Sequence, residues 1–229
     1  MMNKIIKKIA VGTREVLRVK YRLFCPDPKD YSTTDNLTII PCQREAYFLA
    51  LNRYVQPGNE VLDVGFGLGY GLTILAIHAG SVKGIDVDKR CVEYGKGTLL
   101  NRNPKLASLD LYDGEKIPFG DESFDLVTCV DVLEHVKDYD TFLLELLRVS
   151  RRGVFISTPN RRPENTNKNG TPKNYWHLRE WSFDELNTIV SRYGTVEWNF
   201  INGTGEGPFH ISDSVQPSTQ ALTPFIKKR

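Results

Sequence analysis

Short apolar runs alternate with longer amphipathic stretches from residue 60 onward. The apolar runs are four to seven residues long and predict β-strands at residues 61–64, 82–86, 106–111, 124–130 and 154–157. Stretches with helical spacing lie among them, at residues 72–79, 88–101 and 139–149. Strands that alternate with helices predict a parallel sheet that is flanked by helices.

The C-terminal part of the chain has a different pattern. Residues 161–173 are polar and have no apolar period, which predicts a long loop. Ser182 and Glu185 have the spacing of a capping box, so a helix is expected from there to about residue 193. Residues 195–201 and 221–226 predict an antiparallel pair of strands, joined by a polar, glycine-rich connection.

Residues 1–58 are predicted to be a helical N-terminal extension that precedes a core of residues 59–229. Residues 1–22 fit an amphipathic helix with a basic face, and residues 43–54 fit a second helix. A solvated surface is the favoured interpretation of the basic charges, and contact with a membrane surface is the alternative.

A glycine-rich turn follows the first predicted strand. Gly65, Gly67 and Gly69 interrupt the apolar pattern between strand and helix, where glycine lets a ligand approach the backbone. Asp86 ends the next strand, 23 residues after Asp63, a spacing that suits a carboxylate holding ribose hydroxyls. The dinucleotide fingerprint Gly-x-Gly-x-x-Gly/Ala requires a small residue at its sixth position. That position holds Tyr70 when counted from Gly65 and Leu72 when counted from Gly67, so this nucleoside pocket does not fit NAD.

The pattern acid-x-Gly-x-Gly-x-Gly resembles motif I of the class I S-adenosylmethionine-dependent methyltransferases. Residues 113–130, 133–136 and 146–160 also resemble, in the same order, blocks of the ubiquinone-biosynthesis-like (methyltransferase type 11) subgroup. The resemblance implies a Rossmann-like α/β fold with a seven-stranded sheet. Such a sheet is mostly parallel, with one antiparallel strand near the C-terminus and helices on both faces. Phe66 and Leu68 depart from the family, which has small residues between the glycines.

The resemblance also implies S-adenosylmethionine as the cofactor. Asp86 would bind the ribose, Asp113 the adenine amino group, and Val87 would flank the adenine. Val130 and Asp131 would lie near the methionyl part. The cofactor-binding residues implied in this way are Asp63, Gly65, Gly67, Gly69, Asp86, Val87, Asp113, Gly114, Val130 and Asp131. In this family an N-terminal segment often covers the pocket as a lid, which would bring in Tyr31, Gln43 and Arg44.

The methyl group of S-adenosylmethionine is already activated, so the protein must align the acceptor and, for a hydroxyl, remove a proton. His135 and His177 follow the fourth and fifth strands and are the candidate catalytic bases, because open sheets bind ligands at the carboxyl ends of their strands. Arg161, Trp176 and Arg179 are candidate substrate contacts. The segment 177–181 resembles glycan-pathway methyltransferases, which favours O-methylation of a sugar or glycoconjugate precursor.

Other functions stay open at this point. The acceptor could be another small metabolite, a lipid or a quinone, or the chain could bind the cofactor without turnover. A nucleic-acid substrate is disfavoured, because the net charge is only +2 and acidic residues stand after the fourth strand. The four cysteines form no Cys-x-x-Cys pair, so neither a metal site nor a disulfide framework is predicted. Reduced cysteines and the lack of a signal peptide predict a cytoplasmic protein.

Overall fold

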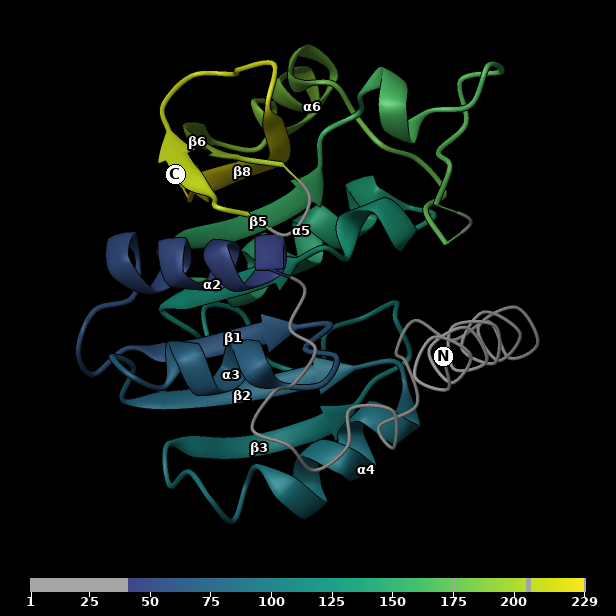
Figure 1. The fold of residues 1–229 in the computed structure, drawn as a ribbon. Coiled ribbons are helices and arrows are strands. Elements are labelled where there is room, and N and C mark those ends of the chain that lie inside the picture. Colours follow the sequence, from purple (N-terminus) through teal and green to yellow (C-terminus); the bar gives the residue numbers. More distant parts are fainter. Residues whose placement is uncertain (1–40, 175, 205–206, 229) are drawn as a thin grey trace, which may run out of the picture.

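The computed structural model describes residues 41–174, 176–204 and 207–228 (Figure 1). The predicted basic helix at residues 1–22 and Tyr31 lie outside these ranges. Within them, no helix has the length and apolar character that are needed to cross a membrane. The helices are α2 (Pro41–Arg53), α3 (Tyr70–Leu75), α4 (Lys89–Thr98), α5 (Tyr139–Val149) and α6 (Phe183–Val190), with the 3₁₀ turns η2 (Leu133–His135) and η3 (Pro163–Asn165).

The strands form one sheet in the order β3-β2-β1-β4-β5-β8-β6-β7. The first five are parallel, while β8 is antiparallel to β5 and β6, and β7 is antiparallel to β6. The strands are β1 (Glu60–Val64), β2 (Ser81–Asp86), β3 (Leu106–Leu111), β4 (Leu126–Val130), β5 (Gly153–Pro159), β6 (Thr195–Asn202), β7 (His210–Ser212) and β8 (Thr219–Lys227). The predicted Rossmann-like α/β fold is confirmed.

The described residues form eight strands, so the prediction of seven is wrong by one. The additional strand, β7, lies in the segment that was expected to be only a polar connection, and it pairs with the end of β6. It has three residues and none of them is buried, so the sequence carries no apolar run there that would predict a strand.

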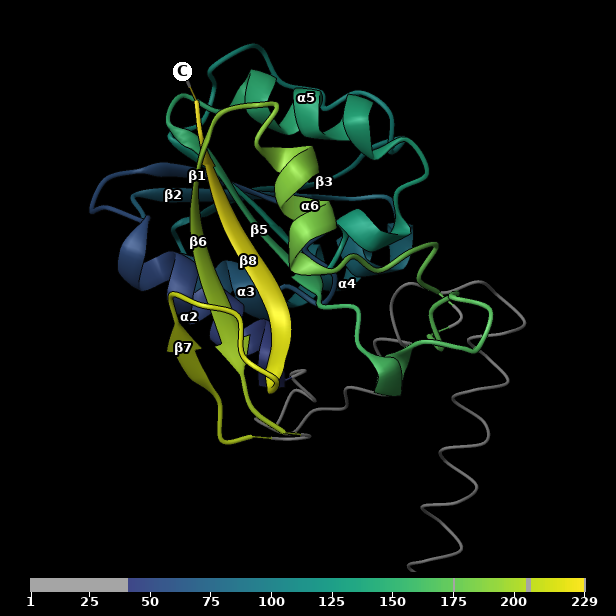
Figure 2. The same ribbon diagram turned by 90° about the horizontal axis from the view of Figure 1, so that it is seen from above.

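Helices cover both faces of the sheet, as predicted (Figure 2). Residues of α2, α3 and α4 share one buried cluster with strand side chains such as Val61 and Phe155. Residues of α5 and α6 share a second cluster with their neighbours along the same strands, Leu62 and Ile156. Consecutive strand residues therefore face opposite layers, and both layers are apolar. This explains why the predicted strands had apolar runs instead of alternating patterns.

Phe66 and Leu68, the two bulky residues between the motif glycines, point into the first of these clusters and are 3% and 5% exposed. The ring of Phe66 occupies space that glycines leave open. A Cβ atom on Gly84 would lie 2.7 Å from Phe66 Cδ1, and one on Gly95 would lie 3.4 Å from Phe66 Cε2. The large side chains therefore fill the core beneath the turn.

One expectation about the cysteines is wrong. Cys91, at the start of α4, is disulfide-bonded, whereas Cys42 and Cys129 are free. The sequence could not indicate this bond, because cysteine spacing alone does not give the pairing.

Candidate functional site

The glycine turn between β1 and α3 has a backbone that only glycine adopts readily. Gly65, Gly67 and Gly69 have φ angles of 76°, 56° and 79°, all in the left-handed region. A side chain would also be obstructed at the outer two positions. A Cβ atom on Gly65 would lie 2.4 Å from Val132 Cγ2, and one on Gly69 would lie 2.3 Å from Leu99 Cδ1.

Asp86 fixes the middle of this turn. Its Oδ2 atom accepts the N–H of Gly67 at 2.8 Å, and its Oδ1 atom accepts the N–H of Asp88 at 2.8 Å. The side chain comes from the last residue of β2 and is 5% exposed. Burial raises the pKa of its carboxyl, and the backbone hydrogen bonds oppose that rise. The spacing between Asp63 and Asp86 therefore reflects a direct contact between the end of β2 and the glycine turn.

Asp63 lies beneath the turn and is fully buried. It accepts hydrogen bonds from Thr128 Oγ1 at 2.7 Å and from Tyr47 Oη at 3.0 Å. Burial raises the pKa of Asp63 to about 7, although both hydrogen bonds lower it. These contacts tie β1 to β4 and to α2, so the carboxylate supports the turn from within the protein.

Val87, Asp113 and Gly114 lie at the carboxyl ends of β2 and β3. Val87 is 48% exposed, and a Cβ atom on Gly114 would lie only 3.2 Å from Val87 Cγ1. Asp113 accepts the N–H groups of Glu115 at 2.9 Å and Lys116 at 3.2 Å, which lower the pKa of its carboxyl. An exposed apolar side chain beside an ionised carboxylate and a glycine suits an adenine ring. Adenine binding by Val87 and Asp113, and a cofactor contact at Gly114, stay predictions.

Asp131 follows Val130 at the end of β4 and has a φ angle of 53°, which is uncommon for a residue other than glycine. Its Oδ1 atom accepts a hydrogen bond from Ser157 Oγ at 2.9 Å, and it is also hydrogen-bonded to Gln43. Gln43 in turn accepts a hydrogen bond from Tyr70. Helix α2, from the predicted lid, therefore reaches the methionyl end of the predicted pocket.

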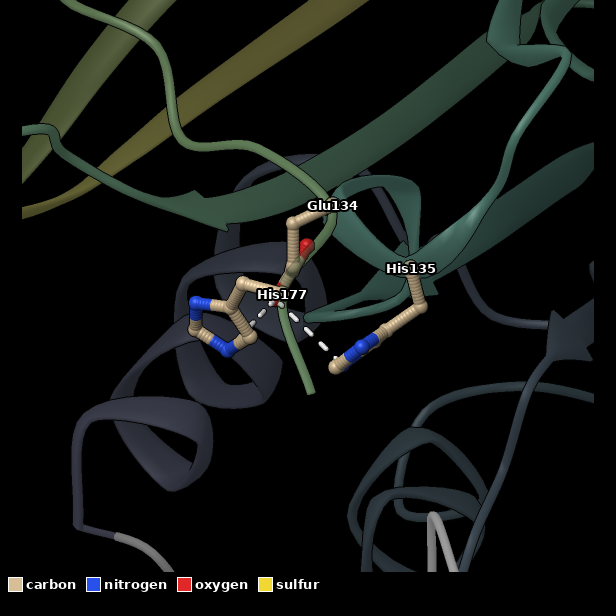
Figure 3. A group of neighbouring side chains, drawn as sticks. All are labelled: Glu134, His135 and His177. Atoms are coloured by element: carbon tan, nitrogen blue, oxygen red, sulfur yellow. Dashed lines mark ion pairs between the residues drawn. The ribbon is translucent and has the colours of Figure 1, made fainter. Parts of the chain in front are cut away.

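The two candidate histidines lie side by side although they are far apart in the sequence. Their rings have centroids 5.0 Å apart and are nearly perpendicular (Figure 3). His135 Nε2 lies 3.9 Å and His177 Nε2 lies 4.0 Å from Glu134 Oε1. Glu134 is fully buried, and its other oxygen accepts a hydrogen bond from Thr158 Oγ1 at 3.0 Å. Burial raises the pKa of this carboxyl well above its usual range.

Hydrogen bonds determine which ring nitrogen of each histidine carries a proton. His135 Nδ1 donates to the carbonyl of Trp176 at 2.8 Å, because a carbonyl oxygen can only accept. His177 Nδ1 donates to Glu180 Oε1 at 2.6 Å, and the amide of Asn174 donates to His177 Nε2 at 2.8 Å. Burial lowers the pKa of His135 to about 4, so its ring is neutral at neutral pH.

The loop between β5 and α6 is attached to the segment after β4 by three kinds of contact. The N–H of Leu178 donates to the carbonyl of Glu134 at 3.0 Å, and Trp176 receives the hydrogen bond from His135. The guanidinium of Arg179 donates to the carbonyls of Val136 and Lys137 at 3.1 to 3.2 Å. These contacts place His177 against Glu134 and His135.

Two of the predicted substrate contacts are engaged in interactions within the protein. Besides its bonds to carbonyls, Arg179 lies over the ring of Tyr139, 4.9 Å from its centroid. Arg161 forms an ion pair with Glu185 at 2.7 Å. Trp176 uses its carbonyl, and the role of its indole stays a prediction. The predicted lid residue Arg44 pairs with the neighbouring Glu45 at 3.2 Å.

Sequence reasoning missed Tyr47, Thr128 and Glu180 as parts of this site. The sequence indicated Glu134 only as part of the motif at residues 133–136 and as one of the acidic residues after the fourth strand. Glu180 stands three residues after His177, which is a signal that could have paired them. Tyr47 and Thr128 belong to an ordinary amphipathic helix and an apolar strand, and nothing in their local sequence distinguishes them.

Comparison with known proteins finds methyltransferases. A family model described as a methyltransferase domain matches residues 62–157. A probable S-adenosylmethionine-dependent methyltransferase of Mycolicibacterium smegmatis is 36% identical over 141 residues, which cover 60% of this chain and 52% of that protein. The phthiotriol/phenolphthiotriol dimycocerosates methyltransferase 1 of Mycobacterium ulcerans is 32% identical over 145 residues, covering 59% of this chain and 50% of that protein.

The chain thus spans about half the length of the curated relatives it matches. Among solved structures, a SAM-dependent methyltransferase from Aquifex aeolicus superposes with a TM-score of 0.58. That match covers 88% of this chain and 96% of the other, at 19% identity. At this identity the likeness supports the fold alone.

Proposed function

We propose that the chain is a class I S-adenosylmethionine-dependent methyltransferase that transfers a methyl group to a hydroxyl oxygen of a small polar acceptor. The methyltransferase-domain model over residues 62–157 and the methyltransferase relatives support the first part of this proposal. A sugar or glycoconjugate precursor is the favoured acceptor class. The observation that carries the proposal is the hydrogen-bonded pair of partly buried His177 and buried Glu180, in which His177 interacts electrostatically with Asp131 at the end of the predicted cofactor pocket.

The residues present fit the cofactor. The glycine turn has a backbone that side chains would obstruct, and a buried carboxylate, Asp86, faces it from β2. Asp86 would hold the ribose hydroxyls, Val87, Asp113 and Gly114 would hold the adenine, and Asp131 would lie beside the methionyl amino group. When bound, S-adenosylmethionine supplies a methyl group on a sulfonium, which needs no further activation by the protein.

The task of this chain's own residues is then to orient the acceptor and to receive its proton. His177 Nε2 carries no proton, because Nδ1 donates to Glu180 and Asn174 donates to Nε2. An acceptor hydroxyl that replaces the Asn174 amide could pass its proton to this atom, and Glu180 would stabilise the resulting charge. The Nδ1 atom of His135 donates to a backbone carbonyl instead of a carboxylate, so we assign His135 a positioning role.

A binding experiment tests the cofactor assignment. The Tm of the full chain is measured with S-adenosylmethionine, S-adenosylhomocysteine, NAD or NADPH. A ligand at 100 times its Kd stabilises the fold by about 2.7 kcal/mol, which raises the Tm by roughly 5–10 °C in a domain of this size. Asp86→Ala should lose the response to both adenosyl compounds, while Asp110→Ala, on the neighbouring strand β3, should keep it. An unchanged response in Asp86→Ala would refute the pocket.

A transfer experiment tests the acceptor and the base. Methyl-labelled S-adenosylmethionine is incubated with a panel of sugars, glycoconjugate precursors, quinols and lipid alcohols; phthiotriol is included because one relative is named for it. His177→Asn should lower kcat by roughly 10²- to 10⁴-fold with little change in cofactor affinity. His78→Asn, at an exposed histidine, is the matched control. Near-normal turnover in His177→Asn would remove His177 as the base, and cofactor binding without transfer to any acceptor would favour a binding module.

A further inference from the structure

We propose that Glu134, His135 and His177 form a binding site for a divalent transition-metal ion, with zinc as the first candidate. One carboxylate oxygen and one nitrogen from each imidazole lie within 4.8 Å of one another (Figure 3). Two imidazoles and one carboxylate are a frequent ligand set of catalytic zinc, and of other divalent transition metals. Magnesium and calcium prefer sites made only of oxygen.

The carboxylate supplies the observation that points to a ligand. Glu134 is fully buried, and its Oε1 atom has no hydrogen-bond partner among the residues that the structure describes. A buried carboxylate oxygen without a donor is costly. This oxygen lies between the two rings, 3.9 Å from one Nε2 atom and 4.0 Å from the other. Its second oxygen, by contrast, has the hydroxyl of Thr158 as a donor.

The surroundings of both imidazoles match those of metal ligands. A histidine that binds a metal usually donates its other ring N–H to a carboxylate or a backbone carbonyl, which orients the ring. His177 Nδ1 donates to Glu180 at 2.6 Å, and His135 Nδ1 donates to the carbonyl of Trp176 at 2.8 Å. In each ring, the hydrogen bond at Nδ1 holds an orientation in which Nε2 faces Glu134.

The distances require only small adjustments. Two ligand atoms that bind one zinc ion tetrahedrally at about 2.1 Å are roughly 3.4 Å apart. The observed separations exceed this value, so the side chains would move on the order of 1 Å to close around an ion. The amide of Asn174, whose side chain is exposed, would have to release His177 Nε2.

Three protein ligands leave coordination positions for water or an acceptor oxygen. A bound ion would lower the pKa of an acceptor hydroxyl, whose proton would pass to water. The ion would then replace His177 as the group that activates the acceptor, since Nε2 would be a ligand. This catalytic role rests on the proposed function, but metal binding itself does not.

The test is titration of the metal-free full chain, without a histidine tag, with zinc sulfate by calorimetry. The expected result is one ion per chain in wild type. Glu134→Gln, which keeps the shape of the side chain, and His177→Asn should each weaken binding by at least about tenfold. His78→Asn should bind as wild type does. Cobalt should give visible ligand-field absorption in wild type that Glu134→Gln lacks, and circular dichroism checks that each variant is folded.

Absence of stoichiometric zinc binding in wild type would overturn the proposal, and so would equal affinity in wild type and Glu134→Gln. The thermal response to S-adenosylmethionine is recorded on the same samples. A protein that responds to the cofactor but binds no zinc would refute the metal site and leave the proposed function standing. The reverse result would refute the cofactor pocket alone.

Discussion

Replacement of Gly84 by alanine should destabilise the protein, because the space next to this glycine is filled by the ring of Phe66. A Cβ atom at position 84 would lie 2.7 Å from Phe66 Cδ1, 2.9 Å from Leu109 Cδ2 and 3.1 Å from Leu72 Cδ2. All three side chains are buried, so none can move into solvent. The added methyl group must therefore displace packed core atoms.

The expected size follows from two opposing effects. Overpacking a filled core costs about 1–3 kcal/mol. Alanine in a strand recovers roughly 0.5–1 kcal/mol relative to glycine through the smaller entropy of the unfolded chain. A net loss of about 1–2 kcal/mol is expected, which lowers the Tm by roughly 2–8 °C for a domain of this size.

The assay is thermal and urea unfolding of Gly84→Ala, with Gly97→Ala as the matched control. A Cβ atom on Gly97, in α4, meets nothing within 4 Å, so alanine there should stabilise by up to about 1 kcal/mol. Phe66→Val lacks the δ carbon in question and should reduce the cost of Gly84→Ala by at least about 0.5 kcal/mol. If Gly84→Ala stabilised the protein as Gly97→Ala does, or if its cost did not depend on Phe66, the ring would not lie where we place it. The interpretation of the turn would then fail.

Two further predictions concern the site. Burial raises the pKa of Asp63 from 3.8 to about 7. Between these two pH values the carboxyl keeps its proton in the native state but has lost it in the unfolded chain. The contribution of Asp63 to the free energy of unfolding therefore falls as the pH rises from about 4 to about 7. Asp63→Asn cannot ionise, and its Tm relative to wild type should rise between pH 5 and pH 8; a constant difference would contradict the assignment. Glu180→Gln should lower kcat by roughly 10- to 100-fold while KM for S-adenosylmethionine changes little, and Glu180→Asp should restore part of the loss. Steady-state kinetics decides, and an unchanged kcat in Glu180→Gln would remove Glu180 as a positioning residue.

The sequence alone determined most of the fold, because strands and helices of this layered type carry their own patterns. The helix at 139–149 and the strand at 106–111 begin and end where their apolar patterns predict. The capping box of Ser182 and Glu185 is present. Strand β7 was missed because three exposed residues carry no apolar signal; they form a strand only because the edge of β6 offers unpaired backbone groups.

The glycine turn and Asp86 could also be predicted from the sequence, since residues that follow one another at strand ends must meet at one edge of the sheet. Only the tertiary structure decided the direction of each side chain. It placed Phe66 in the core and gave Arg161 and Arg179 partners within the protein. Composition and spacing do not contain these directions, because they depend on which space the neighbouring elements leave open.

The cluster of Glu134, His135 and His177 also combines features that the sequence determines with features that only the tertiary structure decides. The sequence separates His135 from His177 by 42 residues and gives each a place after a different strand. The sequence does not reveal that the loop between β5 and α6 is hydrogen-bonded to the segment after β4 through Leu178, Trp176 and Arg179. Those hydrogen bonds form only when parallel strands β4 and β5 are adjacent. The residue types were therefore determined by the sequence, and their convergence on one buried carboxylate oxygen was determined by long-range packing.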